Sequence, residues 1–173
     1  MPRVTFVKKA QKPNSAVSQN DIDRAKLGEE GRASYYWWQF RYGPKQCSKT
    51  RPRPSQLTQS AYYGTIYSIQ EEMQDAGGYE DASDLESARD GWAEQARELG
   101  SECEESLQNM PESLQQAPTG ELLEQRVSAM EAWASELECA DVAMDDHDAE
   151  LETVADYLQG KLEELQAIEP DVE

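Results

Sequence analysis

The sequence is poor in the side chains that most catalytic and metal sites need. It has one histidine, His147, and three cysteines without a C-x-x-C spacing. A lone histidine in the acidic stretch Asp145–Asp148, with no second ligand at a fixed spacing, is more typical of a solvated turn than of a metal site. No Walker loop, G-x-G-x-x-G or G-x-S-x-G motif occurs. We therefore expect a protein that is not an enzyme and that needs no cofactor.

Long apolar runs are also missing. No stretch approaches the roughly 18 consecutive apolar residues of a membrane helix. The first residues, "MPRVTFVKKAQKP", lack the apolar segment of a secretory leader. An odd number of cysteines fits a reducing compartment. These absences predict a cytoplasmic protein that has no membrane partner.

Acidic residues are scarce in one part of the chain and abundant in the rest. Residues 1–63 hold 12 Lys and Arg against 4 Asp and Glu, a net charge of +8. Residues 64–173 hold 4 Lys and Arg against 31 Asp and Glu, a net charge of -27, so the formal total of -19 conceals the segregation. Such asymmetry indicates nucleic-acid contact by the basic part or an acidic interaction surface.

The basic part contains the aromatic stretch "SYYWWQFRYGPKQCSKTRPRPS", residues 34–55. In an extended strand, Tyr36, Trp38, Phe40 and Tyr42 would share one face, and Tyr35, Trp37, Gln39 and Arg41 the other. A turn over Tyr42–Lys45 and a returning strand at "QCSKT" predict a β-hairpin. The run "RVTFVKK", residues 3–9, is a candidate third strand, and residues 10–33 are expected to be a flexible loop.

Apolar residues at helical spacing fill the rest of the chain. The first stripe, residues 58–73, is predicted to begin with Ser55 as N-cap and to end at "DAGG". Further helices are predicted at about residues 82–109, at Leu123–Leu137 and at Leu151–Leu165. The expected fold is therefore α+β: a small antiparallel hairpin or three-stranded sheet packed on a helix in domain 1–75, followed by an acidic helical bundle in domain 76–173.

The aromatic and basic residues form the candidate site. Exposed rings can stack on bases while cationic side chains contact phosphates. In this interpretation the face opposite Trp38 is open and the Trp38 face packs. Two other roles remain open: the rings form a core, or the basic half docks on the acidic helices. The candidate nucleic-acid-binding residues are Tyr35, Trp37, Arg41, Lys45, Lys49, Arg51 and Arg53.

The acidic helices have three interpretations. Their carboxylates can form a solvated face that keeps the bundle soluble. Their apolar stripes can be completed by a protein partner or by a second copy. Alternatively, rows of carboxylates replace phosphates and occupy a basic groove on a target protein.

The stretch Ser34–Ser60 resembles the N-terminal signature of a group of small acidic proteins encoded by tailed bacteriophages. In that group a "YYWW-x-F-R-x-G" strand, an "SKT" segment and "PRPSQLTQS" precede acidic helices. The resemblance implies a phage protein that acts in the host cell cytoplasm, and it brings no assigned activity.

A second, more local similarity covers Trp37–Gln46, "WWQFRYGPKQ". This stretch is similar to the β-hairpin that opens the arm-type DNA-binding module of phage integrases. The similarity implies phosphate contacts by Arg41 and Lys45. It departs from the pattern at Gln46, where a second basic residue is usual, and no recombinase domain follows.

Together these observations predict a non-enzymatic, phage-encoded binding protein. We expect residues 1–75 to contact DNA or RNA, and residues 76–173 to contact a basic host or phage protein. One alternative is an inhibitor that mimics nucleic acid and blocks a host nucleic-acid enzyme or defence complex. Another is a structural or assembly adaptor, and the oligomeric state is left open.

Overall fold

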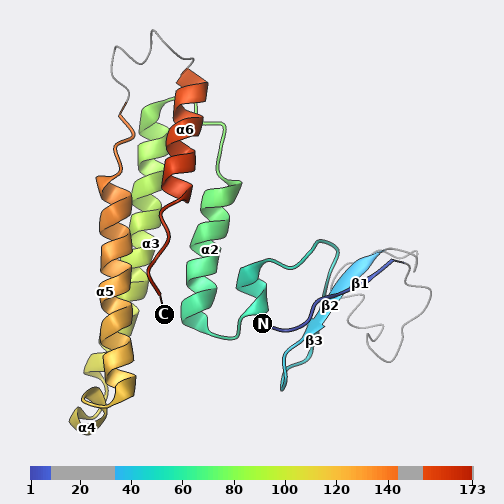
Figure 1. Cartoon of the computed structure of the whole chain (residues 1–173), viewed down its shortest axis with the longest axis vertical. Coiled ribbons are helices and arrows are strands. Elements are labelled where there is room, and N and C mark those ends of the chain that lie inside the picture. Colours follow the sequence, from blue (N-terminus) through green and yellow to red (C-terminus); the bar gives the residue numbers. More distant parts are fainter. Residues whose placement is uncertain (9–33, 144–153, 173) are drawn as a thin grey trace. The chain divides into compact units, whose positions relative to one another are not determined.

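The computed structural model describes residues 1–8, 34–143 and 154–172 (Figure 1). The expected loop at residues 10–33 and His147 lie outside these residues. The chain divides into two compact units, Met1–Tyr67 (unit 1) and Ser68–Glu173 (unit 2). The division falls inside helix α2, Ala61–Asp75, and not at the end of this helix, where the sequence placed it. The reason is that the last turns of α2 belong to unit 2, where the Gln166 side-chain amide donates to the Met73 carbonyl oxygen at 2.7 Å.

Unit 1 contains an antiparallel three-stranded sheet. Its strands are β1, Thr5–Val7, β2, Tyr35–Gln39, and β3, Lys45–Ser48, in the order β1-β2-β3. Phe6 lies opposite Tyr36, and Trp37 lies opposite Cys47. The aromatic and β-branched alternation that favours strands therefore gives the expected hairpin together with its third strand.

The hairpin turn lies two residues earlier than the sequence suggests. The Gly43 amide donates to the Phe40 carbonyl oxygen at 3.2 Å, so the turn covers Phe40–Gly43 and not Tyr42–Lys45. Glycine is favoured at the last position of such a turn, and Pro44 has no amide hydrogen for strand pairing. Pairing with β2 resumes at Lys45. Phe40 and Tyr42 are therefore outside the strand, contrary to expectation.

The first helix also begins later than expected. A short 3₁₀ turn, η1, covers Pro54–Leu57, and α2 starts at Ala61. Ser55 is therefore not the N-cap of α2. The hydroxyl of Ser60 accepts a hydrogen bond from the Tyr63 amide at 3.4 Å, which is the N-cap pattern. Serine occurs at both positions, so the spacing alone could not choose between them.

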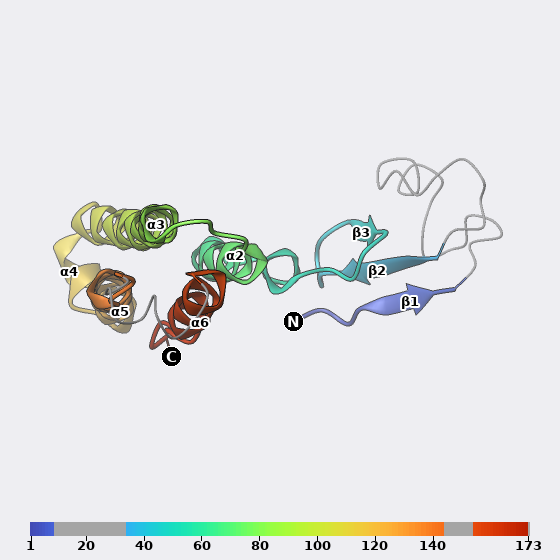
Figure 2. The same ribbon diagram turned by 90° about the horizontal axis from the view of Figure 1, so that it is seen from above.

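Unit 2 is a bundle of helices (Figures 1 and 2). Three long helices follow α2: α3, Ala82–Gln108, α5, Pro118–Cys139, and α6, Val154–Gln166. The short α4, Glu112–Gln115, lies where the chain reverses between α3 and α5. Asp81 caps α3 by accepting a hydrogen bond from the Asp84 amide at 3.0 Å. No described helix contains an 18-residue stretch apolar enough to cross a membrane.

The core of unit 2 follows the predicted stripes. The stripe residues of the three long helices are mostly buried, because each helix turns its apolar face inward. Val154 is an exception: it is 43 % exposed at the first position of α6. Leu151 of the same stripe lies outside the described residues. The largest buried side chains of these helices are Leu85, Trp92 and Leu99 from α3, Met130, Trp133 and Leu137 from α5, and Leu158, Leu162 and Leu165 from α6.

Candidate nucleic-acid interface

The described part of unit 1 carries positive charge without any compensating carboxylate side chain. Residues 1–8 and 34–67 contain seven Lys and Arg residues and no Asp or Glu. Lys45 is half-buried and the other six are exposed. Cationic side chains gathered in this way raise the local concentration of polyanions. The seven residues are Arg3, Lys8, Arg41, Lys45, Lys49, Arg51 and Arg53.

The hairpin places two of these cations beside aromatic rings. The Lys45 ammonium nitrogen lies 5.8 Å from the centre of the Trp37 ring, on the neighbouring strand. The Arg41 guanidinium lies 5.3 Å from the centre of the Tyr42 ring, which is 88 % exposed at the turn. Both distances are within the range of cation–π attraction. Strand pairing and the turn thus each place a cation beside an aromatic ring. Such a pair could stack on a base and contact its phosphate.

Tyr35 is not part of this surface. Its side chain is 2 % exposed, so the expectation that its ring is free to stack on a base is wrong. Burial raises the pKa of the Tyr35 hydroxyl above its usual value, and the nearby Cys47 thiol raises it further. Trp38, on the opposite face of β2, is 4 % exposed. One face of β2 is therefore covered at Tyr35, near the start of the strand, and the other face is covered at Trp38, near its end. The predicted division into a packed face and an open face does not hold.

Two accessible rings were missed by sequence reasoning. Tyr42 was assigned to the packed face because the strand was expected to continue through it. Phe6 of β1 is 47 % exposed and lies against Tyr36, with ring centres 4.7 Å apart and ring planes tilted by 38°. The Gly43-Pro44 pair was the available indication that the strand ends before Tyr42.

The remaining predicted cations lie between β3 and η1. The chain bends after β3, where the Thr50 amide donates to the Ser48 hydroxyl at 3.2 Å. Pro52 is buried, while Arg51 and Arg53 on either side of it are exposed. A buried proline with a fixed φ angle anchors this segment and directs its neighbours outward. Within the described part of the chain, no ion pair involves Lys49 or Arg51.

A cavity of about 630 Å³ opens beside the hairpin turn, within unit 1. We call it the hairpin groove. Two tyrosines from the first turns of α2, Tyr63 and Tyr67, line it, with ring centres 6.5 Å apart and planes inclined by 29°. Of the predicted site residues, only Arg41 reaches it. Lining residues with aromatic, amide, hydroxyl or guanidinium groups include Phe40, Arg41, Thr58, Gln59, Tyr63 and Tyr67.

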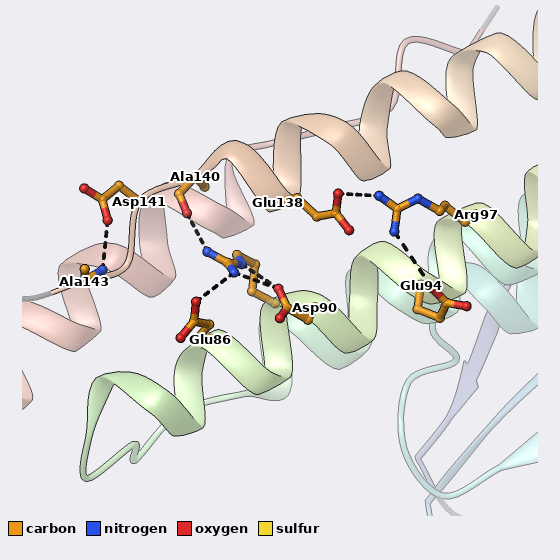
Figure 3. Close-up of polar contacts among 9 residues, drawn as sticks. Glu86, Asp90, Glu94, Arg97, Glu138, Ala140, Asp141 and Ala143 are labelled. Carbon is orange, nitrogen blue, oxygen red and sulfur yellow. Dashed lines mark hydrogen bonds and ion pairs between the residues drawn. The ribbon is translucent and has the colours of Figure 1, made fainter.

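Unit 2 uses its own carboxylates to neutralise several of its few cations. Arg89 of α3 pairs with Glu86 and Asp90 and donates to the Ala140 carbonyl oxygen at 2.9 Å (Figure 3). Arg97 pairs with Glu138 of α5. The hydrogen bond from Arg97 lowers the pKa of the Glu138 carboxyl below its usual value and raises the pKa of Arg97.

The remaining carboxylates of α3 and α5 greatly outnumber these cations. Across residues 1–8, 34–143 and 154–172, no three His, Cys, Asp or Glu side chains cluster as metal ligands would. The surplus of carboxylates over cations gives unit 2 a strongly negative surface.

Comparison with known proteins adds no further residues to the candidate interface. No protein-family model, curated protein or solved structure matches this chain.

Proposed function

We propose that unit 1 binds nucleic acid through its exposed cations and rings. The observation that carries this proposal is the charge of its described residues, which contain seven Lys and Arg and no Asp or Glu. Cations that neutralise phosphates release condensed counterions, and this release favours binding at low salt. The described residues of unit 1 contain no carboxylate side chain that would repel the phosphate backbone.

The two kinds of side chain have separate tasks in this proposal. Arg41, Lys49, Arg51 and Arg53 are exposed and contact phosphates. Trp37 offers a ring for stacking, and Lys45 beside it contacts the adjoining phosphate. The resemblance to phage proteins supports a role inside an infected cell.

Unit 2 binds a basic protein in the same proposal. Residues 64–173 carry a net charge of -27, and Arg89, Arg97 and Lys161 are already paired with carboxylates of unit 2. The surplus of carboxylates is therefore available to a cationic partner. The same surplus favours a second candidate function, in which the acidic helices mimic nucleic acid and occupy the basic groove of a host enzyme or defence complex.

The proposal is tested by measuring fluorescence anisotropy of labelled DNA and RNA with the full chain. Affinity is expected to fall steeply between about 50 and 200 mM salt. Arg51→Gln should reduce the slope of log affinity against log salt by about 0.7 on a single strand. Lys161→Gln, the matched loss of one charge in unit 2, should leave the slope unchanged.

Other outcomes have clear meanings. Absence of binding to any nucleic acid at about 50 mM salt would overturn the proposal. Competition between the full chain and nucleic acid for a basic nucleic-acid enzyme would then support the mimic. A defined oligomer by light scattering, without either behaviour, would support the adaptor.

A further inference from the structure

The hairpin groove has the size and lining of a site for a small aromatic group. Its volume of about 630 Å³ lies within the usual range of ligand pockets, about 300–1,000 Å³. Hairpin residues form one side, the segment before α2 forms another, and Tyr63 and Tyr67 of α2 form a third. The described residues of unit 1, which include the whole lining of the groove, carry cations and no carboxylate side chain, so they favour an anionic ligand.

The lining side chains match the chemistry of a nucleobase. Phe40, Tyr63 and Tyr67 present rings on which a base can stack. The Gln59 amide can both donate and accept a hydrogen bond, as base edges require. The Thr58 oxygen accepts from the Ser60 amide at 3.2 Å, which leaves its hydroxyl hydrogen to donate. Arg41 is exposed and lines the same groove, where it can meet the phosphate attached to that base.

Such a site selects among nucleic acids. In a duplex, each base is stacked on both faces and its Watson–Crick edge is paired, so it cannot enter a groove lined by rings and an amide. An unpaired base in a single strand can enter without this cost. We propose that the hairpin groove receives one unstacked base of a single-stranded nucleic acid, with Tyr67 as the stacking residue and Arg41 on the adjoining phosphate. This inference rests on the proposed function and narrows it to single strands.

The first test uses the parent protein and three labelled probes. These are an oligothymidine of about 12 nucleotides, an abasic strand of the same length and a duplex of the same length. The base-bearing single strand should bind at least about fivefold more tightly than the abasic strand, because each stacked base adds affinity that phosphates do not. It should also bind more tightly than the duplex.

The possible failures separate the two proposals. Equal binding of the abasic strand, or equal or tighter binding of the duplex, would overturn the groove inference and leave nucleic-acid binding by unit 1 intact. Failure of all three probes to bind at low salt would contradict the proposed function itself.

The second test changes the stacking residue. Tyr67→Ala should weaken binding of the base-bearing strand by about five- to tenfold and leave the abasic strand unchanged. Tyr67→Phe keeps the ring and should bind as the parent does. Tyr79→Ala makes the same change in unit 2 and should have no effect. An unchanged affinity in Tyr67→Ala would overturn the inference, and circular dichroism establishes that each variant is folded.

A fourth variant, Gln59→Ala, keeps the inference testable if Tyr67→Ala does not fold. Gln59 is exposed, so Gln59→Ala leaves packing intact. We expect Gln59→Ala to lower the affinity for the base-bearing strand about two- to fivefold relative to the affinity for the abasic strand, because the substitution removes hydrogen bonds to the base edge. An equal loss for both strands would contradict a contact with the base.

Discussion

Lys45 lies diagonally across the β2–β3 pairing from Trp37, with its ammonium nitrogen 5.8 Å from the centre of the Trp37 ring. Trp37 is half-buried, whereas the other three tryptophans, Trp38, Trp92 and Trp133, are 4 %, 6 % and 1 % exposed. Trp37 is therefore the tryptophan that both solvent and ligand can reach most easily.

The quenchable fraction of the tryptophan fluorescence should come mainly from Trp37. Acrylamide should quench a fraction of the emission in the parent protein, and Trp37→Phe should remove most of that fraction, because the remaining rings are buried. Nucleic acid should protect the same fraction if unit 1 binds it. The comparison is a Stern–Volmer titration of parent and variant. Retention of the quenchable fraction in Trp37→Phe would contradict the burial of the other three rings.

Two glycines of unit 2 should respond in opposite ways to alanine. A Cβ atom at Gly120 would overlap the carbonyl group of Gln115 and lie 2.7 Å from its Cα atom, so backbone must move. Gly120→Ala should lower the free energy of unfolding by about 1–3 kcal/mol. Gly91 lies in the middle of α3 on its exposed face, and no atom lies within 4 Å of the Cβ that alanine would add. Gly91→Ala should therefore raise the free energy of unfolding by about 0.5–1 kcal/mol.

Urea unfolding of both variants provides the measurement. The two changes are chemically identical, so opposite shifts of the midpoint at an unchanged slope must come from local structure. Destabilisation by Gly91→Ala would contradict the exposed position of Gly91 on α3. Tolerance of Gly120→Ala would contradict the close contact between Gly120 of α5 and Gln115 of α4.

The three cysteines should be alkylated at different rates. Cys139 is exposed, Cys47 is half-buried and Cys103 is 7 % exposed. Burial raises the pKa of the Cys103 thiol above its usual value, so little reactive thiolate forms at neutral pH. Iodoacetamide labelling followed by mass spectrometry should give the order Cys139, Cys47, Cys103. In denaturant the three rates should converge, and equal rates in the folded protein would refute the burial of Cys103.

The Arg97–Glu138 pair should make stability depend on pH on the acidic side. Its hydrogen bond lowers the pKa of Glu138 in the folded protein below the value of about 4.3 in an unfolded chain. The stabilisation is therefore fully present above the unfolded value and is lost as the pH falls through the folded value. Glu138→Gln should unfold at a lower temperature than the parent at neutral pH, and the difference should shrink in acid.

A matched control is available on the same helix. Glu136 is exposed on α5, and Glu136→Gln removes the same charge two residues away. It should change the unfolding temperature less than Glu138→Gln at neutral pH. A pH-independent difference between Glu138→Gln and the parent would argue against the ion pair as the cause.

Periodicity predicted the elements of this protein well. The alternation around Trp37 and the stripes through Leu85, Trp133 and Leu162 indicate strands and helices, because burial of one face imposes a period of two or of about 3.6 residues. The helix predicted at residues 82–109 matches α3 within one residue at its C-terminal end. The charge segregation was also available from sequence, since it requires only counting.

The burial of particular rings could not be predicted in the same way. Alternation shows that Tyr35 and Trp38 lie on opposite faces of β2. Which side chains on each face are buried depends on the other segments that pack against that face. The hairpin groove was missed for a related reason. Its tyrosines belong to α2, where Tyr63 and Tyr67 flank the apolar stripe, and their approach to Phe40 depends on the turn position and on the chain between η1 and α2.

The continuity of α2 across the two units has a practical consequence for dissecting the protein. Ile69 and Met73, both buried, stand after the division, so a cut at residue 75 would take away one wall of the bundle together with the N-terminal fragment. Separate expression of the two halves therefore calls for a duplicated α2, one copy ending the first fragment and another opening the second. A fusion that transfers unit 1 to another protein should likewise include the whole of α2.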